Sequence, residues 1–130
     1  MKKLFGSKED PKDIKATMMK LKKNKDVKGL IKMLSHQDMA IRLMAVADLG
    51  EIGDERAIKP LQKVLSDRDS TVRNSAVLQL MGFGLPLESL IAPFSDREKL
   101  QCLYFLKNMD EIKKNKEAEG KIENLLKDYG

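Results

Sequence analysis

Apolar residues recur along this chain at the spacing of amphipathic helices. In one stretch they are separated by three and four positions, which places them on one face of an α-helix. These residues are Val27, Leu30, Ile31 and Leu34. A second stretch follows after a polar gap, and its apolar residues are Ile41, Ala45, Leu49 and Ile52. The pattern predicts two consecutive helices, each with one buried face.

This pair of predicted helices occurs twice. The segment 27–54 aligns with the segment 58–85 without a gap, at an offset of 31 residues. Apolar and polar positions coincide in Val27 and Ile58, Leu30 and Leu61, Leu34 and Leu65, Ser35 and Ser66, Asp38 and Asp69, Ile41 and Val72, Arg42 and Arg73, Ala45 and Ala76, Leu49 and Leu80, Ile52 and Phe83, and Gly53 and Gly84. A fixed period of this kind is typical of repeat proteins, so one structural unit is used twice.

The ends of the predicted helices carry their own signals. Asp38 and Asp69 stand where an N-cap must accept the free amide hydrogens of each second helix. Gly53 and Gly84 stand where a residue of left-handed conformation would end these helices. Pro60 lies inside the first helix of the second unit, which we expect it to bend or shorten.

Weaker helical patterns flank the two units. One precedes them at about 13–23, and a less regular pair follows, in which SDRE at 95–98 echoes SDRD at 66–69. The apolar residues of these flanking stretches are Ile14, Met18 and Leu21, then Leu90, Ile91, Phe94, Leu100, Leu103, Tyr104 and Leu106, and finally Ala118, Ile122, Leu125, Leu126 and Tyr129. The predicted organisation is one domain, 1–130, with a basic segment and capping helix at 1–25, repeat 1 at 26–53, repeat 2 at 54–84, a degenerate repeat 3 at 85–110 and a capping helix at 111–130.

The repeated segment resembles HEAT repeats of the short type found in phycobilin-lyase-like proteins. The resemblance is carried by Ile41, Arg42, Ala45, Leu49, Gly50, Ile52, Gly53, Asp54, Ala57, Ile58, Pro60 and Leu61. It implies an all-α fold, a right-handed α-solenoid of helix pairs with N- and C-terminal capping helices, and a common role in protein binding. It also implies structural roles in linking neighbouring repeats for Asp38, Arg42, Asp69 and Arg73. Repeat 3 departs from the pattern, because Leu100 or Gln101 stands where an arginine is expected.

Few residues of the chain suit catalysis or metal binding. The chain has one histidine and one cysteine, His36 and Cys102, which excludes a multi-ligand Cys/His metal site and an intramolecular disulfide. We interpret His36 as a turn residue and Cys102 as a small buried apolar residue. Asp67 and Asp69 superficially resemble a calcium loop, but the required Gly and Glu are missing, so helix capping is preferred. The sequence therefore predicts a protein that is not an enzyme and has no cofactor or metal.

Charge is concentrated at the N-terminus. Residues 1–32 carry eleven Lys against four Asp and Glu, a net +7, whereas residues 33–110 carry nine basic and eleven acidic residues, a net −2. Leu4 and Phe5 are too short an apolar run for a signal peptide, and no stretch has the length of a membrane span. We expect a cytoplasmic protein without integral membrane association.

The leading functional hypothesis is a scaffold or adaptor that binds a protein or peptide partner in a shallow groove on the inner face of the second helices. A helical wheel places on this face Met39, Leu43, Ala47 and Gly50, with Ser70, Asn74, Leu78 and Met81 as their counterparts. Burial of these residues by neighbouring helices, and use of the face by a second copy of the chain, both stay open.

The alternative hypothesis is binding of nucleic acid or another anionic surface, which we favour less because no aromatic residues for base stacking lie among the lysines. The basic residues concerned are Lys12, Lys15, Lys20, Lys22, Lys23, Lys25, Lys28 and Lys32.

Overall fold

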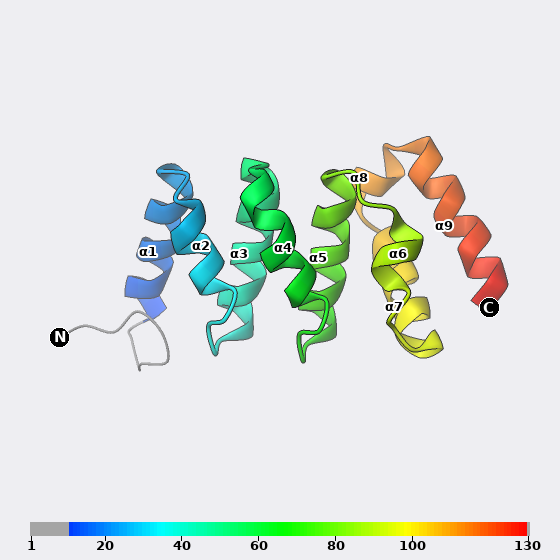
Figure 1. Ribbon diagram of the computed structural model, residues 1–130, viewed down its shortest axis with the longest axis horizontal. Coiled ribbons are helices and arrows are strands. Elements are labelled where there is room, and N and C mark those ends of the chain that lie inside the picture. Colours follow the sequence, from blue (N-terminus) through cyan, green and yellow to red (C-terminus); the bar gives the residue numbers. More distant parts are fainter. Residues whose placement is uncertain (1–10, 130) are drawn as a thin grey trace. The chain divides into compact units, whose positions relative to one another are not determined.

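The computed structural model describes residues 11–129, and every regular element in this range is a helix (Figure 1). The chain divides into two compact units, the first ending at Gly84 and the second beginning at Leu85. Within the described range the prediction of an all-α chain is confirmed.

Unit 1 contains the two regular repeats. Its elements are α1 (Pro11–Lys23), α2 (Val27–Met33), α3 (Met39–Ile52), the 3₁₀ helix η1 (Glu55–Ala57), α4 (Ile58–Val64) and α5 (Ser70–Gly82). The first helices of the repeats, α2 and α4, lie in front of the second helices, α3 and α5, in the view of Figure 1. Within the rear layer α3 packs along α5, and α1 packs on both α2 and α3. Unit 1 is thus a two-layered stack of helix pairs, in which α1 occupies the position predicted for a cap.

The core of unit 1 follows the predicted stripes. The side chains that are at least nine-tenths buried there are Ile14, Met18, Val27, Leu30, Met33, Leu34, Ile41, Ala45, Val46, Leu49, Ala57, Leu61, Val64, Val72, Ala76, Val77 and Leu80. Ile31 and Ile52, which were predicted with the stripes, are only half-buried. Three polar side chains are also buried, those of His36, Arg42 and Asn74.

Three of the four predicted helix ends are confirmed; at the fourth, Phe83 is the C-cap of α5, and Gly84, with a φ of 97°, lies one residue beyond it. The Asp38 carboxylate accepts a hydrogen bond from the Ala40 amide, at 2.9 Å, and starts α3. The Asp69 carboxylate accepts from the amides of Thr71 and Val72 and starts α5. Gly53 ends α3 with a φ of 73°, a left-handed conformation that glycine adopts without steric penalty.

The prediction that Pro60 shortens its helix is wrong. Helix α4 has seven residues, as does α2 in the first repeat. Because α4 begins at Ile58, Pro60 lies in its first turn, where backbone amides have no acceptor within the helix in any case. The missing amide hydrogen of Pro60 therefore removes no helical hydrogen bond.

Unit 2 consists of α6 (Leu87–Ile91), α7 (Asp96–Lys107), α8 (Asp110–Lys113) and α9 (Lys116–Tyr129). Helix α7 begins with a capping box, in which the side chains of Ser95 and Glu98 each accept a hydrogen bond from the other residue's amide. Helix α9 packs along α7 and α8. Its buried residues are Ile122 and Leu126, both from the predicted stripe.

One part of the predicted core of unit 2 is wrong. Tyr104 is half-exposed, at 51%, whereas Cys102 on the same helix is fully buried. The helical wheel of α7 is therefore centred on Cys102, Leu103 and Leu106 rather than on the tyrosine.

Candidate interaction surface

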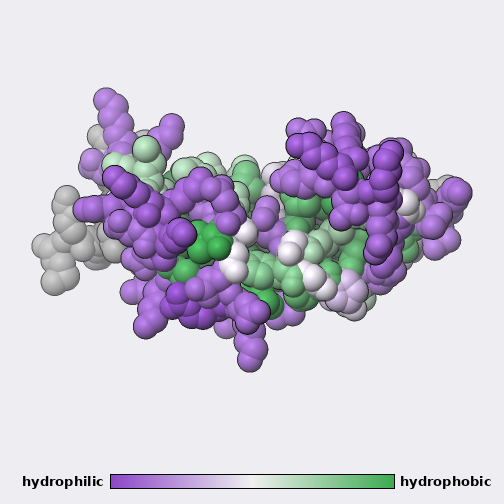
Figure 2. Space-filling model, turned by 90° about the horizontal axis from the view of Figure 1, so that it is seen from above, coloured by the Kyte–Doolittle hydropathy of each residue, from purple (hydrophilic) through white to green (hydrophobic). Residues whose placement is uncertain are grey.

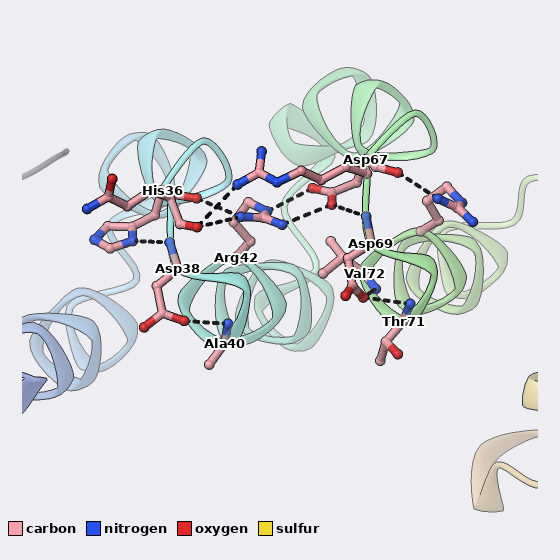
Figure 3. A network of polar contacts seen from close by, with 11 residues as sticks. His36, Asp38, Ala40, Arg42, Asp67, Asp69, Thr71 and Val72 are labelled. Atoms are coloured by element: carbon pink, nitrogen blue, oxygen red, sulfur yellow. Dashed lines mark hydrogen bonds and ion pairs between the residues drawn. The ribbon is translucent and has the colours of Figure 1, made fainter.

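The two repeats of unit 1 are joined by a buried ion pair. The Arg42 guanidinium on α3 donates two hydrogen bonds to the Asp67 carboxylate, from Nε at 2.9 Å and from Nη2 at 3.1 Å (Figure 3). Only 4% of the Arg42 side chain and 9% of the Asp67 side chain are exposed. This bidentate geometry is the strongest form of a side-chain hydrogen bond between ions.

The same arginine also binds the turn that precedes its own helix. Its Nη1 donates to the carbonyl oxygens of His36 and Gln37, at 3.0 and 3.1 Å. Arg68 of the second repeat donates to the Gln37 carbonyl as well, at 3.2 Å. Arg42 therefore links its repeat to the next one, as the resemblance implied. Its acidic partner is Asp67, whereas Asp38 and Asp69, which were expected in this role, cap helices.

His36 lies in the turn between α2 and α3, as predicted. Its Nδ1 accepts a hydrogen bond from the Asp38 amide at 3.0 Å, while its Nε2 is buried and has no hydrogen-bond partner among the described residues. In the second repeat Asp67 accepts the equivalent bond from the Asp69 amide, at 2.9 Å. The histidine therefore replaces an aspartate as the acceptor within the turn.

Most of the residues predicted for the inner face are accessible on the second helices. Met39 is 40% exposed and Ala47 is also exposed, whereas Leu43, Leu78 and Met81 are half-buried. Viewed from above, green apolar surface is visible along the upper edge of unit 1, and hydrophilic side chains predominate along the lower edge (Figure 2). An apolar surface in unit 1 is thus partly open to solvent.

Two of the predicted inner-face residues have other surroundings. Asn74, the counterpart of Leu43, is 6% exposed and so is not available to a partner. Gly50 is adjacent to Gln79 of α5, because a Cβ atom at Gly50 would lie 2.8 Å from the Gln79 Cγ and closer still to its amide. Gly50 therefore belongs to the contact between α3 and α5.

The structure adds members to this surface. Ala40 is exposed and Met44 is half-buried on the same side of α3, and both follow from the helical wheel that placed Leu43 and Ala47 there. We call the resulting surface the α3–α5 face. Its residues are Met39, Ala40, Leu43, Met44, Ala47, Leu78 and Met81.

The predicted basic residues surround the exposed side of α1 and the turn after it. Lys12, Lys15, Lys20, Lys22, Lys23 and Lys25 are all exposed. Lys22 is paired with two carboxylates of α3, at 3.1 Å from Glu51 and 3.8 Å from Asp48. The hydrogen bond to Glu51, with the charges of both carboxylates, raises the pKa of Lys22. Part of the charge expected to attract an anion is therefore already neutralised.

Comparison with known families now identifies the class of protein. A family model described as HEAT repeats matches residues 10–99, which is more than half of the chain. The chain belongs to the HEAT repeat family. The architecture of this HEAT-repeat protein is an α-solenoid, as the sequence predicted, and proteins of the family commonly mediate protein–protein interactions. The match does not identify the phycobilin-lyase-like type. Neither a curated protein nor a solved structure matches the HEAT-repeat chain.

Two further observations concern other classes of site. Within the described residues of the HEAT-repeat protein, no three His, Cys, Asp or Glu side chains are grouped so that they could hold a metal ion. None of the helices between residues 11 and 129 has the length and apolar character needed to cross a membrane.

Proposed function

We propose that this HEAT-repeat protein is a non-enzymatic adaptor of the cytoplasm that binds a protein partner through the α3–α5 face. The observation that carries the proposal is the set of apolar side chains that α3 leaves open to solvent, with Met39 at 40% exposure. Exposed apolar side chains that are adjacent to one another are typical of binding surfaces, whereas scattered ones are not.

The charge of this face fits a partner helix or an extended peptide with apolar side chains. Helix α5 contains one charged residue, Arg73, and the charged residues of α3 are Arg42, Asp48 and Glu51. Arg42 is buried in its ion pair, and the two carboxylates lie next to Lys22. Binding here depends on apolar contact rather than on net charge, so it is expected to resist salt.

The Arg42–Asp67 pair supports the same proposal. Because the pair joins α3 to the turn before α5, the residues of the two helices have fixed relative positions before a partner arrives. A surface that is already ordered loses less conformational entropy on binding.

The test is affinity capture from a lysate of the source cell at low and at high salt. The wild-type chain is compared with two variants, Leu43→Asp/Leu78→Asp and Ala47→Asp. Because Ala47 is exposed, its substitution does not place a charge in the core. A matched control, Asn24→Asp/Gln62→Asp, adds two carboxylates at exposed positions outside the face. Circular dichroism verifies that each variant is folded.

A protein that is captured at both salt concentrations, is lost with both face variants and is retained by the control supports the proposal. Retention by all variants, or equal loss with the control, contradicts the assignment to this face. Sedimentation of the purified chain shows whether the partner is a second copy, because dimerisation through the face would be abolished by Ala47→Asp.

A further inference from the structure

The opposite layer of unit 1 contains a cleft that the proposed function does not use. It has a volume of about 320 Å³ and lies between α2 and α4. Its lining residues are Ile31, Leu34, Ser35, Pro60, Lys63, Val64, Ser66 and Asp67. A cavity of about 150 Å³ is large enough for benzene, so this cleft has room for at least one large apolar side chain.

The cleft lining has an apolar part beside its polar residues. Leu34 and Val64 are 8% and 6% exposed, and both belong to the core of unit 1. Ile31 and Pro60 are half-buried and form apolar parts of the lining on α2 and α4. An inserted apolar side chain would therefore exchange water for contact with four apolar residues, which is favourable.

Four lysines lie on the two helices that flank this cleft, and one of them, Lys63, is part of its lining. Lys28 and Lys32 are exposed on α2, and Lys59 and Lys63 are their counterparts on α4 at the repeat offset of 31 residues. Within each helix the two lysines are four positions apart, so they are on the same side of the helix. The repeat thus produces two parallel pairs of cations with the cleft between the helices that bear them.

The acidic residues next to these lysines in the sequence lie just before the two helices, at Asp26 and at Glu55 of η1. Neither α2 nor α4 contains an Asp or Glu. Within the described part of the chain, none of the four lysines makes an ion pair. The one carboxylate in the cleft lining is that of Asp67, which is neutralised by the bidentate contact with Arg42.

We propose that this α2–α4 face, defined by the cleft and Lys28, Lys32, Lys59 and Lys63, is a second interaction surface that binds an acidic segment of a protein partner. One large apolar side chain of the segment occupies the cleft, and flanking Asp or Glu residues face the lysines. The proposal uses different helices from the α3–α5 face and does not depend on it.

The combination of a partly apolar cleft with exposed lysines on both flanking helices favours this occupant over other anions. A phosphodiester backbone has no apolar side chain for the cleft, and the cleft has no aromatic residue on which a base could stack. A lipid surface would be attracted by the lysines but would leave the cleft empty. An acidic peptide with a large apolar residue satisfies both features of the face.

The test begins with the purified full chain and a displayed library of random dodecapeptides, selected at low salt. The expected result is enrichment of peptides with a Leu, Met, Ile or Phe between acidic residues. One enriched peptide is then synthesised with fluorescein, and its affinity is measured by fluorescence anisotropy for wild type and variants.

Two variants separate charge from shape. Lys32→Glu/Lys63→Glu reverses one charge on each helix that flanks the cleft, and Ser35→Trp fills the cleft from an exposed position without changing charge. Each variant is expected to lower the affinity for the peptide by about tenfold or more. The matched control, Lys113→Glu/Lys114→Glu, makes the same charge change at exposed positions in unit 2 and is expected to bind as wild type. Circular dichroism verifies folding.

Several results would overturn the proposal. One is that no peptide is enriched, and another is that the enriched peptides lack acidic residues. A third is that Ala47→Asp abolishes binding while the variants of the α2–α4 face bind as wild type. A fluorescein-labelled DNA duplex and phosphatidylserine vesicles are measured alongside. If either binds more tightly than the peptide and is lost with Lys32→Glu/Lys63→Glu, the face belongs to nucleic acid or lipid instead. Failure here leaves the capture experiment on the α3–α5 face unaffected.

Discussion

Arg42 and Asp67 are 25 residues apart in sequence and form two hydrogen bonds across the boundary between the repeats, both side chains being almost fully withdrawn from water. Removing one member of a buried ion pair leaves the other charge without compensation. Such a change destabilises a protein by about 3 to 5 kcal/mol. This gives the first prediction.

Arg42→Ala and Asp67→Ala are each expected to lower the free energy of unfolding by about that amount, measured by urea denaturation. The double variant Arg42→Met/Asp67→Leu leaves no uncompensated charge. Its loss of unfolding free energy is therefore expected to be far smaller than the sum of the losses of the two single variants. Additive losses would show that the two side chains do not act as a pair.

Arg56 and Asp54 form an equally short pair at an exposed site, at 2.9 Å, so Arg56→Ala is the matched control and is expected to change stability little.

The second prediction compares two leucines of α5. Leu80 is fully buried, as the sequence predicted, and Leu80→Ala is expected to destabilise unit 1 by about 2 to 5 kcal/mol. Leu78 is half-buried on the α3–α5 face, so Leu78→Ala removes fewer contacts and is expected to destabilise clearly less. Thermal and urea unfolding give both values. Equal losses would mean that Leu78 belongs to the core and is not available for binding.

The third prediction concerns Gly50, where α3 and α5 approach closely. A Cβ atom at this position would overlap the Gln79 side chain. It would lie 2.8 Å from the Gln79 Cγ and closer still to the amide group. Gly50→Ala forces the Gln79 side chain out of its present rotamer and is therefore expected to destabilise by about 0.5 to 1.5 kcal/mol. In a Gln79→Ala background the overlap is gone, and the better helix propensity of alanine is expected to make the same change neutral or stabilising by up to about 1 kcal/mol. If Gly50→Ala has the same effect in both backgrounds, the close approach is not the reason for the glycine.

The fourth prediction is a pH dependence at Asp54. Hydrogen bonds from the Arg56 side chain and backbone lower the pKa of Asp54 from 3.8 to about 2. A carboxyl group with a lowered pKa favours the folded state above pH 3.8, and this contribution is lost as the pH falls through about 2. NMR titration of the Asp54 carboxyl is expected to show this midpoint, which should move back toward 3.8 in Arg56→Gln. An unchanged midpoint in the variant would exclude the arginine as the cause.

Much of unit 1 could be predicted from the sequence because its signals are local and occur twice. Asp38 and Asp69 cap the helices that follow them directly, and Leu49 and Leu80 occupy the same position of one repeated stripe. A helical wheel finds such a stripe from the residues of one helix alone, without information about the helices that pack on it.

The features that escaped prediction depend on neighbours. The carboxylate that binds Arg42 could not be chosen between Asp67 and Asp69 by alignment, because the choice depends on the direction in which the turn presents each side chain. Leu43 and Asn74 have the same position in the repeat but different exposure, since a wheel does not record what packs on the other side of a helix. The lysine pairs flanking the α2–α4 cleft were detectable in the alignment, but the cleft was not.

The Arg42–Asp67 link has no equivalent between α1 and the first repeat. The residue 31 positions before Arg42 is a proline, and the position equivalent to Asp67 is His36. Helix α1 is attached by apolar packing and by the pairs from Lys22 to Asp48 and Glu51, in which the lysine side chain is 44% exposed. Concentrated electrolyte screens exposed pairs and hardly affects buried ones. Ionic strength should therefore act on the two junctions unequally, loosening α1 while the repeats stay joined.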